Sequence, residues 1–221
     1  SDEAAKESLE LATALILLEE KGVEELEARH RSKARVIYQS AEPVRRLPPS
    51  KEQFDVCVIG HLRAEKDPFR AALAADLLPP TSRVRVIHAG KPYSEEFAEE
   101  ARLHASKNPR YHWLGEVPPR EARRLLARSR LLAQTSVMEG GANTVSEALA
   151  SGVPVVASDV PGNVGMLGED YPGYYKVGDE ETLARLLYRA ETDAAFYGEL
   201  KARGDARTYL VLPEREKAAL G

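Results

Sequence analysis

The sequence predicts an α/β fold whose centre is a doubly wound parallel sheet of the Rossmann type. From residue 54 onward, short apolar runs alternate with amphipathic stretches at the spacing of strand–helix–strand units. The short runs are continuously apolar instead of alternating, which is typical of parallel strands buried on both faces. Because such sheets bind ligands beyond the carboxyl ends of their strands, we expect the functional site at that edge.

The individual elements follow from the same pattern in chain order. Strands are predicted at 55–59, 84–89, 111–114, 131–135, 153–157 and 174–177. Helices are predicted at 68–78, 94–106, 119–127, 144–151 and 180–191. These elements define a main domain over residues 54–192. The remaining residues 193–221 are rich in Arg, Glu and Ala and predict a helical segment that ends near Pro213.

Residues 1–42 do not fit the start of this sheet. They predict helices at 7–13 and 23–30 and strands at 14–18 and 34–39, followed by a Pro-rich, basic linker at 43–53. We interpret residues 1–42 as the end of a truncated N-terminal α/β domain. The alternative is an irregular extension packed on the main sheet. Two strands alone bury little apolar surface, so a detached piece of this size is expected to be weakly stable.

Composition excludes several classes of protein. The 221 residues are 43% hydrophobic and 30% charged, which excludes a disordered chain, a collagen and a coiled-coil rod. The net charge of −4 argues against a bulk nucleic-acid binder. The most apolar run, 15–18, is far shorter than the ~20 residues that span a bilayer. The single cysteine, Cys57, excludes an internal disulfide and favours a reducing, cytoplasmic setting.

The densest chemical signal lies between the fourth and fifth predicted strands. A loop with Gly140 and Gly141 leads into a helix that starts near Asn143, a good N-cap residue, and ends at Gly152. Glycines let a ligand approach the backbone closely. The free N–H groups and partial positive charge of a helix amino end suit a phosphate or diphosphate.

Two acids, Glu139 and Glu147, flank this predicted anion site, eight residues apart. An ionised carboxylate only accepts hydrogen bonds, so its natural partners beside an anion site are hydroxyl groups of a ribose or hexose. The loop and helix therefore predict contacts to a sugar, a diphosphate and a ribose in succession.

Glu139 and Glu147 also resemble the E-x7-E motif of the retaining GT-B glycosyltransferases often called group 1 or family 4. The serine before the pair, the glycines inside it and the Gly-x-Pro-Val-Val strand after it make the resemblance specific. It covers about residues 54–192, which correspond to the C-terminal, donor-binding half of a two-domain enzyme. Glu147 then looks like the carboxylate that holds the ribose hydroxyls of the donor nucleotide, and Glu139 looks like the acid near the donor sugar.

The same resemblance implies roles for the backbone of this loop and helix. The N–H groups of Gly140 and Gly141 would face the sugar hydroxyls. Those of Asn143, Thr144 and Val145 would face the diphosphate. Solvation of the loop and capping of the helix are the alternative roles for the two acids.

A second segment, from Gly60 to Lys66, is similar to the family's Gly-Arg-Leu-x-x-x-Lys pattern, whose cations neutralise the diphosphate. Lys66 matches the lysine, whereas His61 stands where the family has Arg. Arg63 is the expected replacement cation, because a guanidinium fork suits two phosphate oxygens. Arg63 can also be an ordinary surface residue, and His61 either lines the donor site with Gly60 or is structural. Leu114 matches a segment that flanks the nucleobase.

Residues 161–175, together with the Gly-His-Leu-Arg-x-x-Lys-Asp-Pro segment, resemble the selenosugar synthase subgroup of the selenoneine pathway. That enzyme joins a sugar from a UDP-sugar to selenophosphate through selenium. In this segment Asn163 and the backbone of Gly165 are placed to line the cleft, because they follow a strand end.

The resemblance implies transfer with retention, without metal or cofactor, in which Glu139, Lys66 and Arg63 do the catalytic work. The expected partner is a nucleotide-sugar donor, with the acceptor held by a missing N-terminal domain and little activity in this part alone. Two other classes stay open: a binding module without turnover, and another GT-B enzyme such as a nucleotide-sugar epimerase or a phosphorylase.

Overall fold

The computed structural model of the protein describes residues 2–221. Its centre is a six-stranded sheet, in which every neighbouring pair of strands is parallel. The order is β5-β4-β3-β6-β7-β8, with β3 (Phe54–Ile59) and β6 (Leu131–Gln134) in the middle. The other strands are β4 (Val84–Ala89), β5 (Tyr111–Trp113), β7 (Val155–Ser158) and β8 (Tyr174–Tyr175). The predicted doubly wound α/β fold is confirmed.

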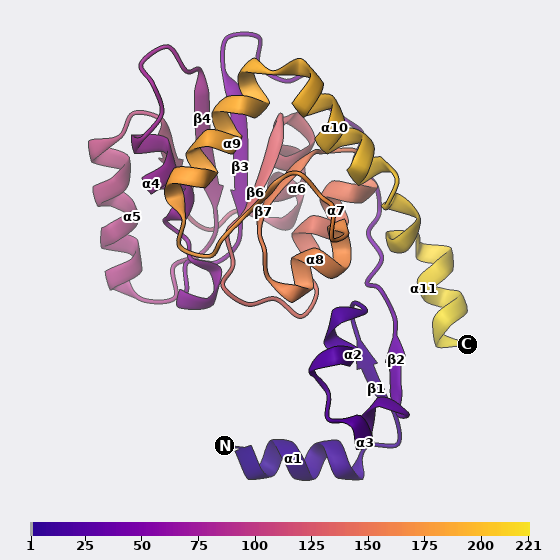
Figure 1. Cartoon of the computed structure of the whole chain (residues 1–221). Helices are drawn as coiled ribbons and strands as arrows, with labels where there is room; N and C mark the ends of the chain where they lie inside the picture. The colour runs from indigo at the N-terminus through magenta and orange to yellow at the C-terminus, as the bar shows by residue number, and fades with distance from the viewer. Residues whose placement is uncertain (1) are drawn as a thin grey trace.

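Helices cover both faces of this sheet (Figure 1). On one face α4 (Arg70–Asp76) packs against α9 (Glu180–Thr192), and on the other α6 (Pro119–Arg128) and α7 (Asn143–Ala150) contact β3 and β6. Helix α5 (Glu95–Lys107) lies beside the edge strand β5. Because both faces are covered, the central strands β3, β6 and β7 are buried almost along their whole length, as their apolar sequences predict.

The single cysteine lies in this core. Cys57 in β3 is fully buried, and burial raises the pKa of its thiol to about 12. It packs as a small apolar side chain and is unreactive as a thiolate.

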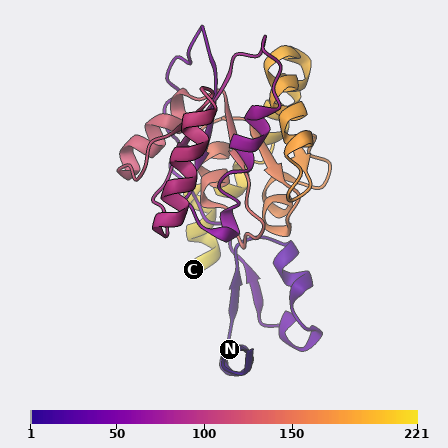
Figure 2. The same ribbon diagram turned by 90° about the vertical axis from the view of Figure 1, so that its left-hand side faces the viewer.

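Residues 2–36 form a separate unit, here called the N-terminal lobe, which lies below the main domain in both views (Figures 1 and 2). Its strands β1 (Leu15–Leu17) and β2 (Ala34–Val36) pair only with each other, in parallel. Its helices are α1 (Asp2–Leu11), α2 (Lys21–Glu25) and α3 (Ala28–Arg31). The lobe contacts the main domain where α2 meets α8 (Pro161–Leu167).

Two predicted elements need correction, and one helix was not predicted. The helix expected at 23–30 is two short helices, because Leu26 between them has an extended backbone (ψ 141°). Residues 161–167 form helix α8, although two glycines lower its helix propensity. The C-terminal segment does not end near Pro213: this proline starts a further helix, α11 (Pro213–Leu220), where its missing N–H costs nothing.

After α9 the chain runs back toward the residues that precede the linker, and the Ala41 N–H donates to the Val211 carbonyl at 3.1 Å. Helix α10 (Ala194–Asp205) and the short 3-10 helix η2 (Thr208–Val211) lead to α11, where Glu216 accepts a hydrogen bond from the Ser40 N–H at 3.2 Å. No helix within residues 2–221 is long and apolar enough to cross a membrane.

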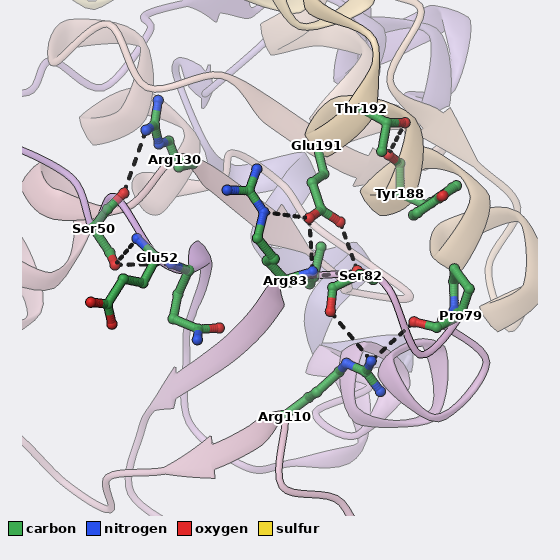
Figure 3. Close-up of polar contacts among 12 residues, drawn as sticks. Ser50, Glu52, Pro79, Ser82, Arg83, Arg110, Arg130, Tyr188, Glu191 and Thr192 are labelled. Carbon is green, nitrogen blue, oxygen red and sulfur yellow. Dashed lines mark hydrogen bonds and ion pairs between the residues drawn. The ribbon is translucent and has the colours of Figure 1, made fainter.

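The amino-terminal edge of the sheet is closed by polar contacts (Figure 3). The Glu191 carboxylate of α9 accepts hydrogen bonds from Ser82 Oγ and the Arg83 N–H, both at 2.7 Å. The guanidinium of Arg110 donates to the carbonyl oxygens of Pro79 and Ser82 at 3.0 and 3.3 Å. These bonds fasten α9 and the chain leading into β5 to the start of β4, so this edge is used for structure. The predicted site residues lie at the opposite edge.

Candidate functional site

A small cleft, whose volume of about 10 Å³ has room for little more than one water molecule, opens at the carboxyl ends of β3 and β6. Its polar lining comes from Gly60, which follows β3, from Lys66, and from Gln134 and Ser136 at the end of β6. The two central strands of a doubly wound sheet thus deliver these residues to one place, as the topology predicts.

Glu139 lies beside this cleft with only 8% of its side chain exposed. A single oxygen, Oε1, accepts hydrogen bonds from Ser136 Oγ at 2.6 Å and from Gln134 Nε2 at 2.7 Å. The same oxygen pairs with the ammonium group of Lys66. Among the hydrogen bonds of residues 2–221, none reaches Oε2, so that oxygen keeps its lone pairs for a hydroxyl donor.

The backbone around Lys66 is fixed to the loop that carries Glu139. Lys66 ends the 3-10 turn η1 (Ala64–Lys66), and its carbonyl accepts a hydrogen bond from Thr135 Oγ1 at 2.8 Å. The Val137 N–H donates to the Glu65 carbonyl at 2.9 Å. The structure therefore brings Lys66 and Glu139, which lie far apart in sequence, into a preorganised ion pair.

The amino end of α7 differs from the sequence expectation in its cap. Asn143 is the first helical residue, and Ala142 stands at the cap position, where no side chain accepts a backbone hydrogen bond. The Val145 N–H donates to the Ala142 carbonyl at 2.8 Å, so Val145, which is buried, has no free N–H for a ligand. The N–H groups of Asn143 and Thr144 have no acceptor within the described chain.

The two glycines before α7 have different surroundings. Gly140 is exposed and a Cβ added there would meet nothing within 4 Å. A Cβ added to Gly141 would lie 2.5 Å from Cβ of Leu18, so the N-terminal lobe comes up against the loop at this point. Gly152, just past the helix, has a φ of 63° and confirms the predicted glycine at the end of α7.

Glu147 lies one turn further along α7 and is half-buried. Burial raises the pKa of its carboxyl group, and the nearby Arg123 of α6 opposes this shift. No hydrogen bond to its carboxylate is formed by residues 2–221. A carboxylate without internal partners on the helix that begins at Asn143 can accept bonds from hydroxyl groups.

Three predicted residues are not drawn into the cleft. Arg63 has 46% of its side chain exposed and faces Glu65 at 3.9 Å. His61 is exposed, and its Nδ1 accepts a hydrogen bond from the Lys91 N–H at 3.3 Å. Leu114 is 47% exposed and lines a separate groove beside α6 with Val117. Of the residues expected at the diphosphate, the structure gathers Gly60, Lys66 and the start of α7.

Asn163 does not line the cleft, which corrects the expectation for this residue. It is fully buried, and its amide donates to the Ser158 carbonyl at 3.0 Å. Ser158 in turn donates to the Ser136 carbonyl at 2.5 Å, so Asn163 supports the site from behind. The backbone of Gly165 packs against Glu19 of the N-terminal lobe.

Sequence reasoning missed two residues of the site. Gln134 was predicted only as part of an apolar strand. It is the one polar residue of the strand Leu-Leu-Ala-Gln, and a polar residue at that position could have indicated a role in the site. His88 at the end of β4 is buried, with ring nitrogens 3.1 Å from the Gly60 carbonyl oxygen and 3.0 Å from the Tyr111 hydroxyl. Burial lowers the pKa of His88 to about 4, so its ring is neutral and positions Gly60.

The described residues contain no group of three or more His, Cys, Asp or Glu side chains that could hold a metal ion.

Solved structures of similar fold place the chain in a structural class. HepE from Anabaena, in complex with UDP-glucose, has a TM-score of 0.83 and 17% identity, over 99% of this chain and 65% of that one. Sucrose-phosphate synthase from Thermosynechococcus elongatus has a TM-score of 0.80 and 20% identity, over 99% and 59%. A TarM variant from S. aureus, in complex with Fondaparinux, alpha-GlcNAc-glycerol and UDP, has a TM-score of 0.75 and 15% identity, over 99% and 44%. The fold is therefore that of the GT-B glycosyltransferases, and the chain spans less than two thirds of these proteins.

The family follows from the sequence. The model of the family "Glycosyl transferases group 1" matches residues 40–207 of the sequence. The chain therefore belongs to this family. No match was found among the curated proteins.

Proposed function

We propose that this chain binds a nucleotide-diphosphate sugar, a UDP-sugar, and forms the donor-binding half of a retaining glycosyltransferase. One observation carries the proposal: Lys66 of η1 forms an ion pair with Glu139 in the loop that leads into α7, whose first N–H groups, on Asn143 and Thr144, have no acceptor within the described chain. A cation, two free N–H groups and a carboxylate in one place match a charged diphosphate joined to a hydroxyl-rich sugar. The UDP and UDP-glucose in complexes of similar fold support the choice of nucleotide.

In this proposal the diphosphate lies across the start of α7. The N–H groups of Asn143 and Thr144 donate to its oxygens, and the partial positive charge of the helix end favours an anion there. Lys66 contributes a full charge from the opposite side of the loop. Arg63 supplies a second cation, since its guanidinium is exposed on the same turn as Lys66.

The nucleoside lies deeper along the same helix. Glu147 accepts hydrogen bonds from the ribose hydroxyls, for which it has to be ionised. Because burial raises the pKa of Glu147, we expect UDP affinity to fall as the pH is lowered through this raised value. Gly60, which lines the cleft after β3, lies on the path of the phosphates.

The sugar end of the donor lies at Glu139. Oε2 of Glu139 accepts from a sugar hydroxyl, and the N–H groups of Gly140 and Gly141 face neighbouring hydroxyls. During transfer the bond from the anomeric carbon to the diphosphate oxygen breaks, and its electron pair leaves with UDP. Lys66, Arg63 and the amino end of α7 stabilise that growing charge, for which one donor is typically worth about 3–4 kcal/mol of the barrier.

For the acceptor we propose selenophosphate, as in the selenosugar synthases. A lone pair on selenium forms the new bond to the anomeric carbon with retention, while UDP departs, so no oxidant or reductant is consumed. The support is the likeness of residues 161–175 and of the segment from Gly60 to Pro68 to that subgroup. The acceptor is held by an N-terminal domain of the whole enzyme.

The donor proposal is tested by titrating the chain with UDP in a calorimeter. We expect Glu147→Ala to weaken UDP binding about tenfold or more, because charged hydrogen bonds to the ribose are lost. Glu147→Gln keeps one acceptor oxygen and should lose less. Glu199→Ala, at an exposed acid on α10 that forms no hydrogen bond or ion pair within residues 2–221, is the matched control and should bind like the unchanged chain. Equal UDP affinity in Glu147→Ala contradicts the ribose assignment.

The acceptor proposal is tested by mass spectrometry of the whole enzyme incubated with UDP-sugars and selenophosphate. We expect a product that contains the sugar, selenium and phosphate, together with free UDP. Tight UDP binding without any transfer to selenophosphate or to other acceptors contradicts the proposed transferase activity and favours a binding module. Conversion of the UDP-sugar without acceptor indicates an epimerase.

A further inference from the structure

Gln134 is a buried amide at the last position of β6, only 4% exposed, after three fully buried apolar residues. A buried amide is destabilising unless its donor and acceptor both find partners. Nε2 of Gln134 donates to Glu139 Oε1 at 2.7 Å and to Ser136 Oγ at 3.1 Å. Its Oε1 accepts a hydrogen bond from Thr144 Oγ1 at 3.2 Å. All of these partners belong to the candidate site.

The two ends of the amide therefore join two parts of the site. Glu139 belongs to the loop before α7 and is proposed to meet the sugar. Thr144 belongs to the first turn of α7 and is proposed to meet the diphosphate. A side-chain amide offers a strong donor and a strong acceptor at a fixed separation, and neither a carboxylate nor an apolar residue can replace both bonds.

We propose that Gln134 is a positioning residue that couples the sugar-side carboxylate Glu139 to the diphosphate-side helix end at Thr144. This inference rests on the proposed function. Nε2 keeps Glu139 Oε1 turned into the protein, which leaves Oε2 for a sugar hydroxyl. Oε1 of Gln134 accepts the hydrogen bond that the Thr144 hydroxyl donates, so Thr144 serves the diphosphate through its N–H and not through its hydroxyl.

A role in packing alone predicts different behaviour. The neighbours Leu131, Leu132 and Ala133 are apolar and buried, and an apolar side chain of equal length would satisfy packing at position 134. Gln134→Met keeps the length and removes both hydrogen bonds. Gln134→Glu keeps the acceptor for Thr144 but loses the donor to Glu139 and adds a like charge. Thr144→Val removes only the bond from the helix end.

The first measurement compares calorimetric affinities of the chain for UDP and for UDP-glucose. We expect Gln134→Met and Gln134→Glu to weaken UDP-glucose about tenfold relative to UDP, because a hydrogen bond to a charged group is lost. Thr144→Val should shift the ratio less and in the same direction. Gln53→Met, a half-buried glutamine at the far edge of the sheet, is the control and should leave both affinities unchanged. An unchanged ratio in both Gln134 variants overturns the inference.

The second measurement needs no ligand. In a double-mutant cycle of Gln134→Met and Glu139→Ala, followed by urea unfolding, we expect the two effects on the unfolding equilibrium constant to deviate from additivity by about fivefold or more. Additive effects overturn the inference. If the unchanged chain binds neither UDP nor UDP-glucose, the proposed donor function fails, and the cycle still decides whether Gln134 holds Glu139. Should Gln134→Met not fold, Gln134→Glu takes its place in the cycle with Glu139→Ala, because it also loses the donor to Glu139.

Discussion

At the scale of single residues, some members of the site could be predicted from their spacing in the sequence, whereas others are recognised only from their contacts in the fold. Glu139, Glu147 and Lys66 were predicted because charged residues beside glycines and a helix start carry a recognisable pattern. Val145 was predicted to offer its N–H, but the cap at Ala142 lacks a side-chain acceptor and the first turn tightens onto its carbonyl. Such a local bond depends on backbone angles that the sequence does not specify.

His88 shows a further property that spacing does not reveal. Its neutral ring is held between the Gly60 carbonyl and the Tyr111 hydroxyl, and burial lowers its pKa to about 4 from an ordinary value of 6.5. The unfolded chain therefore binds a proton at higher pH than the folded chain does. His88 thus destabilises the fold as the pH falls from about 6.5 to about 4, by up to about 3 kcal/mol.

Replacing this ring tests the pH dependence. We expect His88→Gln to flatten the pH dependence of the free energy of unfolding between pH 7.5 and 5, because Gln supplies a donor and an acceptor but does not titrate. The measurement is urea unfolding at both pH values. His112→Gln, at an exposed position of the neighbouring strand β5, is the control and should keep the slope of the unchanged chain. An identical slope in His88→Gln would refute the assignment.

At the scale of elements, the strands and long helices were predicted well and α8 was not. The buried strands β3 and β4 are continuous apolar runs, and their limits differ from the prediction by at most one residue. Helix α8 was not predicted, because Gly162 and Gly165 lower its helix propensity. A Cβ on Gly162 would lie 2.2 Å from the Glu139 carbonyl oxygen, so the glycine is required by contact with the site loop. Tertiary contact of this kind overrides local propensity.

At the scale of the whole molecule, a buried carboxylate of the N-terminal lobe, Glu19, lies at its contact with the main domain. Glu19 is only 2% exposed, and it accepts hydrogen bonds from the N–H groups of Lys21 and Gly22 at 2.5 and 2.7 Å. It lies directly against Gly165 of α8, and burial raises its pKa. The exposed ion pair between Lys21 and Glu169 adds little to this contact.

A methyl group at this contact should loosen the lobe. A Cβ on Gly165 would lie 2.0 Å from Glu19 Oε2 and 2.7 Å from Glu19 Cβ, and overpacking of this kind costs about 1–3 kcal/mol. We expect Gly165→Ala to make residues 18–42 more sensitive to limited proteolysis. Gly198→Ala on α10, where a Cβ meets nothing within 4 Å, is the matched control and should digest at the original rate. Equal digestion of both variants would show that the lobe does not depend on this contact.

The six-stranded sheet ends on both sides in very short strands, with three residues in β5 and two in β8. An outermost strand carries unpaired N–H and carbonyl groups that can recruit a strand from another molecule, and a short one offers few of them. The short edge strands thereby protect the main domain against edge-to-edge association. Its interior strands can therefore be strongly apolar without promoting such association.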